Sequence, residues 1–198
     1  FSDVLASGGS SEEDQRNYFR IIQSNSDLLL RLINDILDLS RLEANKVILT
    51  PEDCDVVQLC RQALSSVEMS RRESGNRFVF ETKTDSFVLQ TDIQRLQQVL
   101  INLLTNAAKF TKNGTITLQF EVEKEKNRVL FAVADTGCGI PKEKQKQVFE
   151  RFEKLNEYAQ GTGLGLSICK LTVDKWGGDI WIDPDYEGGA RFVVSHPL

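Results

Sequence analysis

The hydrophobic positions of the first fifty residues repeat with the period of a long amphipathic helix. Ser10 and Glu13 have the spacing of a capping box, and a heptad seam of apolar residues follows them. The seam consists of Phe19, Ile22, Leu29, Ile33 and Ile36, with Ser26 and Ser40 in register. A helix over 12–44 would be about 50 Å long at ~1.5 Å per residue. Further leucines widen its apolar surface, so we expect it to pack in a multi-helix bundle.

A partner for this helix is indicated by the residues before it. Residues 1–6, followed by a Ser-Gly-Gly-Ser turn, resemble the end of an antiparallel helix. The pattern then changes at Thr50-Pro51. We therefore expect two parts, a helical hairpin region over 1–49 and a second domain over 50–198.

Helices and strands alternate through the second domain. The predicted helices cover 56–72, 91–109 with Thr91 and Gln94 as a capping-box pair, a segment opening near Pro141, and a segment between the glycines at 161–165 and Gly177. The predicted strands cover 78–82, 115–122, 128–134, 179–183 and 190–195, the second and third joined as a hairpin around Lys126-Asn127. This order predicts an α+β fold, a two-layer sandwich with helices on one face of a mixed sheet.

Composition narrows the possible partners. The chain has 29 acidic and 24 basic residues and no basic block, so we expect no nucleic-acid partner. Apolar runs fall short of the ~18–20 residues of a membrane span, so we expect no direct membrane contact. Four cysteines without CxxC spacing and a single histidine, His196, favour neither a zinc site nor disulfides and fit a reducing cytoplasm.

The candidate chemistry starts on the predicted helix 91–109. Beside its apolar stripe, Gln98, Asn102, Asn106 and Lys109 follow one another at steps of three and four residues, which places them on one face. Asparagine is a mediocre helix former, but its side-chain oxygen is a suitable ligand for Mg²⁺. Taken alone, two asparagines four residues apart are more simply explained as a polar edge.

Two glycine motifs add to this face. Asp135-Thr-Gly-Cys-Gly-Ile140 follows a strand, where a buried carboxylate can accept from the amino group of adenine. Gly161-Thr-Gly-Leu-Gly-Leu166 opens a helix, whose exposed amides and dipole favour phosphate. Alone, the first motif is equally well an ordinary turn. The second is neither a Walker nor a Rossmann loop, because it lacks the lysine of the one and the preceding strand of the other.

Together and in this order, these motifs resemble the catalytic domain of sensor histidine kinases, a Bergerat-type ATP-binding fold shared with gyrase, MutL and heat-shock chaperone ATPases. The resemblance covers almost the whole chain, because the helix 12–44, ending Asp-Leu-Ser-Arg-Leu-Glu, is similar to the second helix of the family's dimerisation and phosphotransfer hairpin. The matching boxes are 102–111 (asparagine), 135–140 (first glycine), 149–152 (phenylalanine), 161–166 (second glycine), and the closing glycines at 177–178 and 188–189.

The resemblance implies a role for each matching residue. Asn106 would bind Mg²⁺, Asn102 and Lys109 would face the phosphates of ATP, Phe110 would pack at the nucleotide, and Asp135 would recognise adenine. The other implied nucleotide contacts are Gly137, Gly139, Ile140, Lys154, Gly161, Thr162, Gly163, Leu164, Gly165 and Leu166. Phe149 and Phe152 would anchor the base of a lid, or serve equally well as core aromatics.

The implied reaction is transfer of the γ-phosphoryl group of ATP to a histidine, and then to an aspartate of a response regulator receiver domain. The implied protein is a homodimer, the cytoplasmic portion of a membrane-anchored bacterial sensor. The family's acceptor histidine lies in the first helix of the hairpin, whereas His196 falls in the last predicted strand, where we expect a structural role. We therefore expect the acceptor to lie upstream of Phe1 in a longer protein.

Two alternatives remain. An ATPase of the same fold is disfavoured because Gln98 stands one turn before Asn102, near where those enzymes need an acidic residue to activate water. A non-catalytic regulatory module that binds nucleotide, or only a partner, is disfavoured by the intact motifs.

Overall fold

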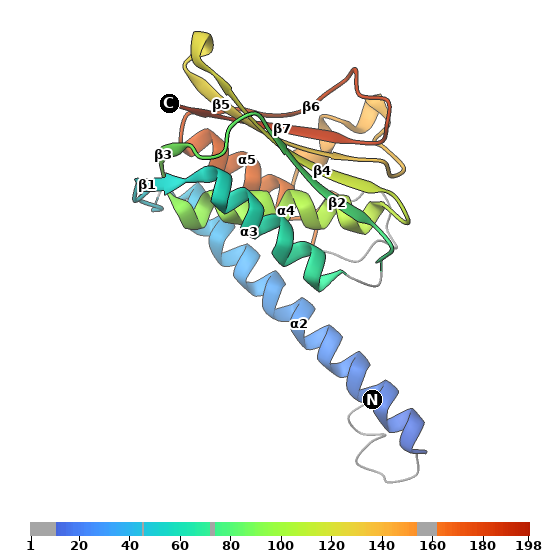
Figure 1. The fold of residues 1–198 in the computed structure, drawn as a ribbon. Helices are drawn as coiled ribbons and strands as arrows, with labels where there is room; N and C mark the ends of the chain where they lie inside the picture. The colour runs from blue at the N-terminus through green and yellow to red at the C-terminus, as the bar shows by residue number, and fades with distance from the viewer. Residues whose placement is uncertain (1–10, 45, 72–73, 154–161) are drawn as a thin grey trace.

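The computed structural model describes residues 11–44, 46–71, 74–153 and 162–198. A long helix, α2 (Glu12–Glu43), extends from an α/β body, with its N-terminal end far from the body (Figure 1). Its N-cap is Ser11, whose side chain accepts a hydrogen bond from Asp14 N at 3.1 Å. The predicted cap at Ser10 and Glu13 is therefore displaced by one residue. The expected helix end at 1–6 lies outside the described residues.

The body is built on a mixed sheet with the strand order β2-β4-β5-β7-β6 in the described part of the chain. β2 (Arg77–Thr82) is parallel to β4 (Thr115–Glu123), and the remaining neighbours are antiparallel. These are β5 (Arg128–Asp135), β7 (Arg191–Pro197) and β6 (Ile180–Ile182). A 3-10 turn over Lys124–Lys126 and Asn127 with φ 51° close the β4–β5 hairpin where the sequence predicted it.

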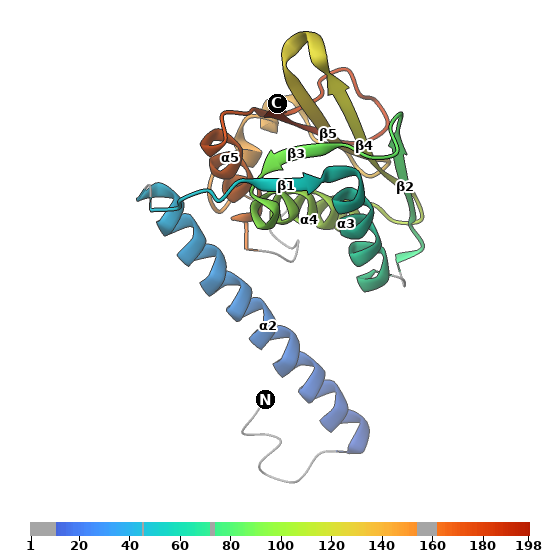
Figure 2. The ribbon, with the colours of Figure 1, turned by 60° about the vertical axis from the view of Figure 1, so that its left-hand side comes forward.

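Three helices cover one face of this sheet, as Figures 1 and 2 show. They are α3 (Val56–Ser70), α4 (Ile93–Phe110) and α5 (Gly165–Lys175). The apolar stripe of α4, including Leu96, Leu100 and Leu104, is fully buried against sheet residues such as Ile116 and Phe131. The α+β two-layer sandwich predicted from the sequence is confirmed.

A second small sheet was not predicted. β1 (Glu52–Asp55) pairs antiparallel with β3 (Val88–Thr91). Four-residue strands are too short for an alternating pattern to stand out, and β1 buries only Cys54. Because Thr91 ends β3, it does not cap α4. That cap is Asp92, whose carboxylate accepts from Arg95 N at 3.1 Å.

The helix predicted near Pro141 is also wrong. Pro141 is extended, with ψ 139°, and two separate 3-10 turns follow at Lys142–Lys144 and Gln147–Phe149. Within these turns only Val148 is buried. Without an apolar stripe to bury, a regular helix gains nothing from packing here.

Candidate functional site

The predicted polar face of α4 splits into residues with different partners. Gln98 is engaged with the end of α2: its Nε2 donates to Asp38 Oδ2 at 2.9 Å, and its Oε1 accepts from Arg95 Nη1 at 2.9 Å. Arg95 also forms an ion pair with Asp38 at 3.4 Å. Gln98 therefore belongs to a contact between α4 and α2.

One turn further, Asn102 joins α4 to α5. Its Nδ2 lies 3.4 Å from the carbonyl of Gly165 and 3.7 Å from Cys169 Sγ. Burial raises the pKa of the Cys169 thiol to about 12, so the sulfur stays protonated at neutral pH. Asn102 thus holds the first turn of α5 beside the asparagine row.

Asn106 and Lys109 follow on the same face. The Asn106 side chain is half-buried and makes no hydrogen bond among the described residues, so its oxygen is available to a ligand. The Lys109 ammonium lies 4.8 Å from the centre of the Phe110 ring. The C-terminal end of α4 therefore brings together an amide oxygen, a cation and an aromatic ring.

Asp135 ends β5 and is buried. Its Oδ1 accepts from Gly137 N at 2.8 Å and from Ala190 N at 3.3 Å. Burial raises the pKa of this carboxyl, and the two amide hydrogen bonds oppose the rise. Because both amides bond Oδ1, Oδ2 remains able to accept from a ligand.

Thr111 lies beside this carboxylate and has an orphaned hydroxyl. Its side chain is 1% exposed, and Oγ1 has no hydrogen-bond partner in the described part of the chain. It lies close enough to Asp135 to lower the pKa of the carboxyl, although without the geometry of a hydrogen bond. A buried hydroxyl without a partner costs free energy, which a bound polar group would recover.

Glycines keep the space around these two side chains open. A Cβ on Gly137 would lie 2.9 Å from both Asp135 Oδ1 and Thr111 Oγ1, so a larger residue would fill the space beside them. Gly139 has φ +69°, and its next residue, Ile140, is half-buried. Asp135, Thr111, Gly137 and Phe110 thus form one cradle, which we call the carboxylate cradle.

The loop that precedes β7, residues 188–190, packs against Asp135 and Gly137 of this cradle. A Cβ on Gly189 would lie 2.8 Å from Asp135 Oδ1 and 2.8 Å from Gly137 N, and Ala190 donates one of the two amides to Asp135. Neither Gly189 nor Ala190 was a predicted site residue. The Gly188-Gly189-Ala190 run was the available signal, because paired glycines often mark a close approach of backbone.

The second glycine motif is described from Thr162 onwards, while Lys154 and Gly161 lie outside the described residues. Gly163, with φ +74°, accepts a hydrogen bond from Phe152 N at 3.0 Å, and a Cβ there would lie 2.9 Å from Phe152 Cα. Phe152 is 61% exposed, with φ +59°, whereas Phe149 packs edge-on against Phe192. Phe149 is thus a core aromatic, and Phe152 is not.

Leu164 is the N-cap residue of α5, and Gly165 and Leu166 are its first helical residues. Leu164 is fully buried, and no described side chain caps the helix. The first-turn amides therefore remain open to an anionic ligand. Asn102 on α4 faces this turn, whereas Thr162 contacts α2.

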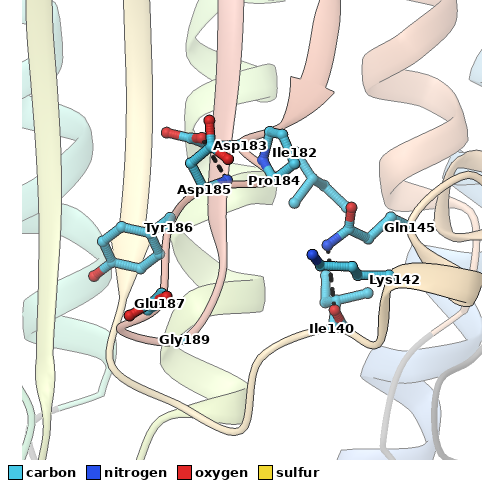
Figure 3. Close-up of a pocket in the computed structure, with 10 residues that line it drawn as sticks. All are labelled: Ile140, Lys142, Gln145, Ile182, Asp183, Pro184, Asp185, Tyr186, Glu187 and Gly189. Atoms are coloured by element: carbon cyan, nitrogen blue, oxygen red, sulfur yellow. Dashed lines mark hydrogen bonds between the residues drawn. The ribbon is translucent and has the colours of Figure 1, made fainter.

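A cavity of about 420 Å³ lies between residues 140–145 and the loop 182–189. Figure 3 shows Gln145 donating to the Ile140 carbonyl on one side, with Asp183 and Asp185 across the cavity. Of the predicted site residues that the structure describes, Ile140 alone lines it. Gly189 lines it as well and lies against Asp135, so the cavity adjoins the carboxylate cradle.

The last turns of α2 contact the body through residues that sequence reasoning missed. Leu39 and Leu42 pack against Leu164 and Ile168, and Glu43 forms an ion pair with Arg151. The predicted seam on the opposite side stays open, with Phe19 63% and Leu29 61% exposed. Heptad reasoning identified that exposed face, but it could not tell which part of the body the helix would meet.

His196 has structural surroundings, as expected. It is buried, its Nε2 lies 3.1 Å from Thr91 Oγ1, and its ring stacks on Trp176 with the centroids 5.0 Å apart. Burial lowers its pKa, so the ring is neutral at neutral pH.

Two family models match the chain. Residues 91–198 match the histidine kinase-, DNA gyrase B- and HSP90-like ATPases, and residues 1–45 match the His Kinase A (phospho-acceptor) domain. The chain belongs to this ATPase family. It is the catalytic domain of a sensor histidine kinase with part of the dimerisation region.

Curated relatives of this kinase domain include two bacterial enzymes. The circadian input-output histidine kinase CikA of Synechococcus elongatus is 38% identical over 196 residues, 96% of this chain and 26% of CikA. The sensor histidine kinase WalK of Bacillus subtilis is 30% identical over 203 residues, 100% of this chain and 33% of WalK. The chain thus spans no more than about a third of these proteins.

Solved histidine kinase structures share the fold of this kinase domain. Full-length ShkA in complex with AMPPNP has a TM-score of 0.81 and 31% identity, over 93% of this chain and 39% of that chain. ThkA in complex with the response regulator protein TrrA has a TM-score of 0.76 and 29% identity, over 95% of this chain and 52% of that chain. In the described residues no helix is both long and apolar enough to cross a membrane.

Proposed function

We propose that this kinase domain binds Mg²⁺·ATP and donates the γ-phosphoryl group to a histidine on a phosphoacceptor helix. The observation that carries the proposal is the carboxylate cradle. Asp135 presents an unengaged Oδ2 beside the orphaned Thr111 hydroxyl, in a space that Gly137 keeps open. A base with adjacent donor and acceptor atoms, such as adenine, matches this pair of groups.

The residues of the cradle would recognise the base. Asp135 Oδ2 accepts from the exocyclic amine, and the Thr111 hydroxyl gains its missing partner from a ring nitrogen or a bridging water. Phe110, the member of the cradle at the end of α4, covers the base. Gly139 and Ile140 form its other wall.

The ends of α4 and α5 would hold the phosphates. The amides of Gly163, Gly165 and Leu166 donate to phosphate oxygens, while the Leu164 amide is engaged by Thr162 Oγ1. The α5 dipole favours the negative charge. Lys109 contributes a cation and Asn102 orients the first turn of α5. Asn106, whose side chain has no partner among the described residues, fits a Mg²⁺ site completed by water and phosphate oxygens. A bound Mg²⁺ would neutralise phosphate charge during transfer.

The two parts of the chain fit the partners of such a kinase. We assign 1–49 to a dimerisation and phosphotransfer hairpin and 50–198 to the catalytic domain. The exposed apolar residues of α2 support a helical bundle in a homodimer. The ThkA–TrrA complex supports a response regulator as the onward acceptor. Four free thiols, all in described residues, support a cytoplasmic site, on the inner side of a membrane-anchored sensor.

The test combines binding with transfer. Titration calorimetry with ATP, with and without Mg²⁺, measures nucleotide binding. Phosphoryl transfer is measured as acid-labile labelling of a separately supplied hairpin that carries an acceptor histidine. Mg²⁺-dependent binding and a labelled hairpin are expected. Hydrolysis without labelling would indicate an ATPase of the same fold, and absence of nucleotide binding would indicate a regulatory module.

A further inference from the structure

The second glycine motif is contacted by a residue from the other part of the chain. Thr162 Oγ1 donates to Asp35 Oδ2, on α2, at 2.8 Å, and the same oxygen accepts from Leu164 N at 3.2 Å. A threonine hydroxyl has one hydrogen, so its donation to Asp35 turns the lone pairs toward the Leu164 amide. Asp35 therefore sets the orientation of a hydroxyl that in turn fixes backbone at the start of α5.

This contact is part of a continuous docking surface. Asp38 and Leu39 lie three and four residues after Asp35, and Leu42 lies four and three residues after them, so the four residues share one side of α2. Leu39 and Leu42 pack against Leu164 and Ile168, which surround the same turn. Figure 2 shows the last turns of α2 beside the body, on the side of α5, and the first turns extending away from it.

The same helix holds both segments that meet at Gly163. Glu43 forms an ion pair with Arg151, and the next residue, Phe152, donates its amide to the Gly163 carbonyl. Asp35 accepts a hydrogen bond from Thr162, the residue that precedes Gly163. Asp35 is half-buried, and burial raises the pKa of its carboxyl. The last turns of α2 thus fix the backbone of the glycine motif from two directions.

We propose that Asp35 is a positioning residue for the nucleotide phosphates. It holds Thr162 so that the amides of the glycine motif face the phosphate oxygens, which links docking of α2 to nucleotide affinity. The inference rests on the proposed nucleotide binding and adds to it a residue outside the matched ATPase region, 91–198. Because such linkage is reciprocal, bound nucleotide also strengthens the docking of α2.

The experiment is a double-mutant cycle on the whole chain. Dissociation constants for Mg²⁺·ATP are measured by titration calorimetry for Asp35→Ala, Thr162→Val and the double variant. We expect each single change to weaken binding by about three- to tenfold, as for loss of one modest hydrogen bond. The double variant should be no weaker than either single one, because both changes remove the same bond. Losses that add in the double variant would overturn the proposal.

Conservative variants and a second ligand distinguish an effect on the position of the phosphates from an effect on the stability of the fold. Thr162→Ser keeps the hydroxyl and should bind like the wild type, and Asp35→Asn keeps an acceptor and should lose less than Asp35→Ala. Adenosine, which lacks phosphates, should bind all variants equally when titrated by NMR. A lower melting temperature for Asp35→Ala with unchanged ATP affinity would reduce the contact to a structural one.

Asp27→Ala is the matched control, because Asp27 is an exposed carboxylate about two turns earlier on α2. Its ATP affinity should equal that of the wild type, and a loss as large as that of Asp35→Ala would overturn the proposal. If Asp35→Ala fails to fold, the comparison of Thr162→Val with Thr162→Ser still decides. A wild-type chain that does not bind ATP would refute the proposed function itself, whereas normal wild-type binding with an unaffected Asp35→Ala refutes only this inference.

Discussion

At the scale of single residues, the carboxylate cradle contains two polar groups that lower the stability of the fold. A buried carboxylate and a hydroxyl without a partner both cost folding free energy. Here Asp135 receives two backbone amides on one oxygen, while Thr111 receives none among the described donors. Buried polar groups that lack some of their hydrogen-bond partners are common in binding sites.

The adenine assignment predicts the behaviour of Asp135→Asn. The substitution places an amide group where Oδ2 would face the amine of adenine, so a donor can meet a donor. A lost charged hydrogen bond of roughly 1.5–3 kcal/mol corresponds to a loss of about ten- to a hundredfold in ATP affinity. Titration with ATP and with GTP measures the effect, and an unchanged preference for ATP would remove Asp135 from the adenine site.

The thermal stability of Asp135→Asn is the control for its ATP affinity. Asn can still accept from Gly137 and Ala190, and it removes the cost of burying a charge. Because the folded-state pKa of Asp135 is raised, that cost is present above the raised pKa and disappears as the pH falls toward the unfolded-state pKa. The variant should therefore be at least as stable as the wild type at neutral pH, and thermal melting at neutral and acidic pH checks this.

The metal assignment predicts a different result for Asn106→Ala. Asn106 is half-buried beside the apolar stripe of α4 and has no described side-chain partner, so its removal should leave the fold intact. Mg²⁺-dependent ATP binding should be lost, because the proposed ligand oxygen is gone. Calorimetry with and without Mg²⁺ makes the measurement, and normal Mg²⁺·ATP affinity would rule the assignment out.

At the scale of elements, α4 is tied to its surroundings by its cap. Asp92 accepts from Arg95 N, and its other carboxylate oxygen lies 3.2 Å from Thr50 N, at the start of the catalytic part. Asp92→Ala should therefore lower the free energy of unfolding by about 1–2 kcal/mol, as for loss of an N-cap.

Gln94→Ala is the matched control for this prediction. Gln94 is exposed and is the residue that a capping box opened at Thr91 would have used. Since Asp92 is the cap, Gln94→Ala should change stability by less than about 0.5 kcal/mol. Urea denaturation compares the two variants, and equal losses would contradict the cap seen in the structure.

The same helix shows how much of the fold could be predicted. Its apolar stripe predicted the approximate length and the buried face correctly, because a 3.6-residue period over eighteen residues is a strong signal. The cap was wrong by one residue because Thr91 and Asp92 are both good capping residues. Only the pairing of β3 with β1 and the contact with His196 decide that Thr91 belongs to the strand. Such long-range pairings leave little local trace in a four-residue strand.

The candidate site divides in the same way. Asp135, Gly137 and the asparagines lie in contiguous motifs and could be predicted, whereas Gly189 and Asp35 reach the site from distant segments. Their roles depend on which loop packs behind β5 and which side of α2 meets α5. A heptad pattern contains no information on either contact.

At the scale of the whole molecule, the proposed nucleotide site can be tested apart from any histidine that accepts the phosphoryl group. His196, its single histidine, is buried in β7, with Nε2 against Thr91 and Nδ1 near the carbonyl of Pro197. Phosphorylation of either nitrogen would require the buried His196 side chain to leave these contacts. At this position β7 is paired with β5, where His196 lies opposite Val129, and opening a core strand is costly in free energy.

The chain of 198 residues should therefore bind Mg²⁺·ATP without acquiring acid-labile phosphate. When a separate hairpin with an acceptor histidine is added, label should appear on the hairpin alone. The reason is that the exposed apolar side of α2 can pack against the hairpin and bring its histidine to the bound nucleotide. Acid-labile phosphate is measured on each separated chain, with Asn106→Ala as the control that cannot supply it. His196→Gln should label the hairpin as well as the wild type does, provided that it folds. Label on His196 of the wild-type chain would contradict its structural role, and an unlabelled hairpin despite normal ATP binding would count against the kinase activity itself.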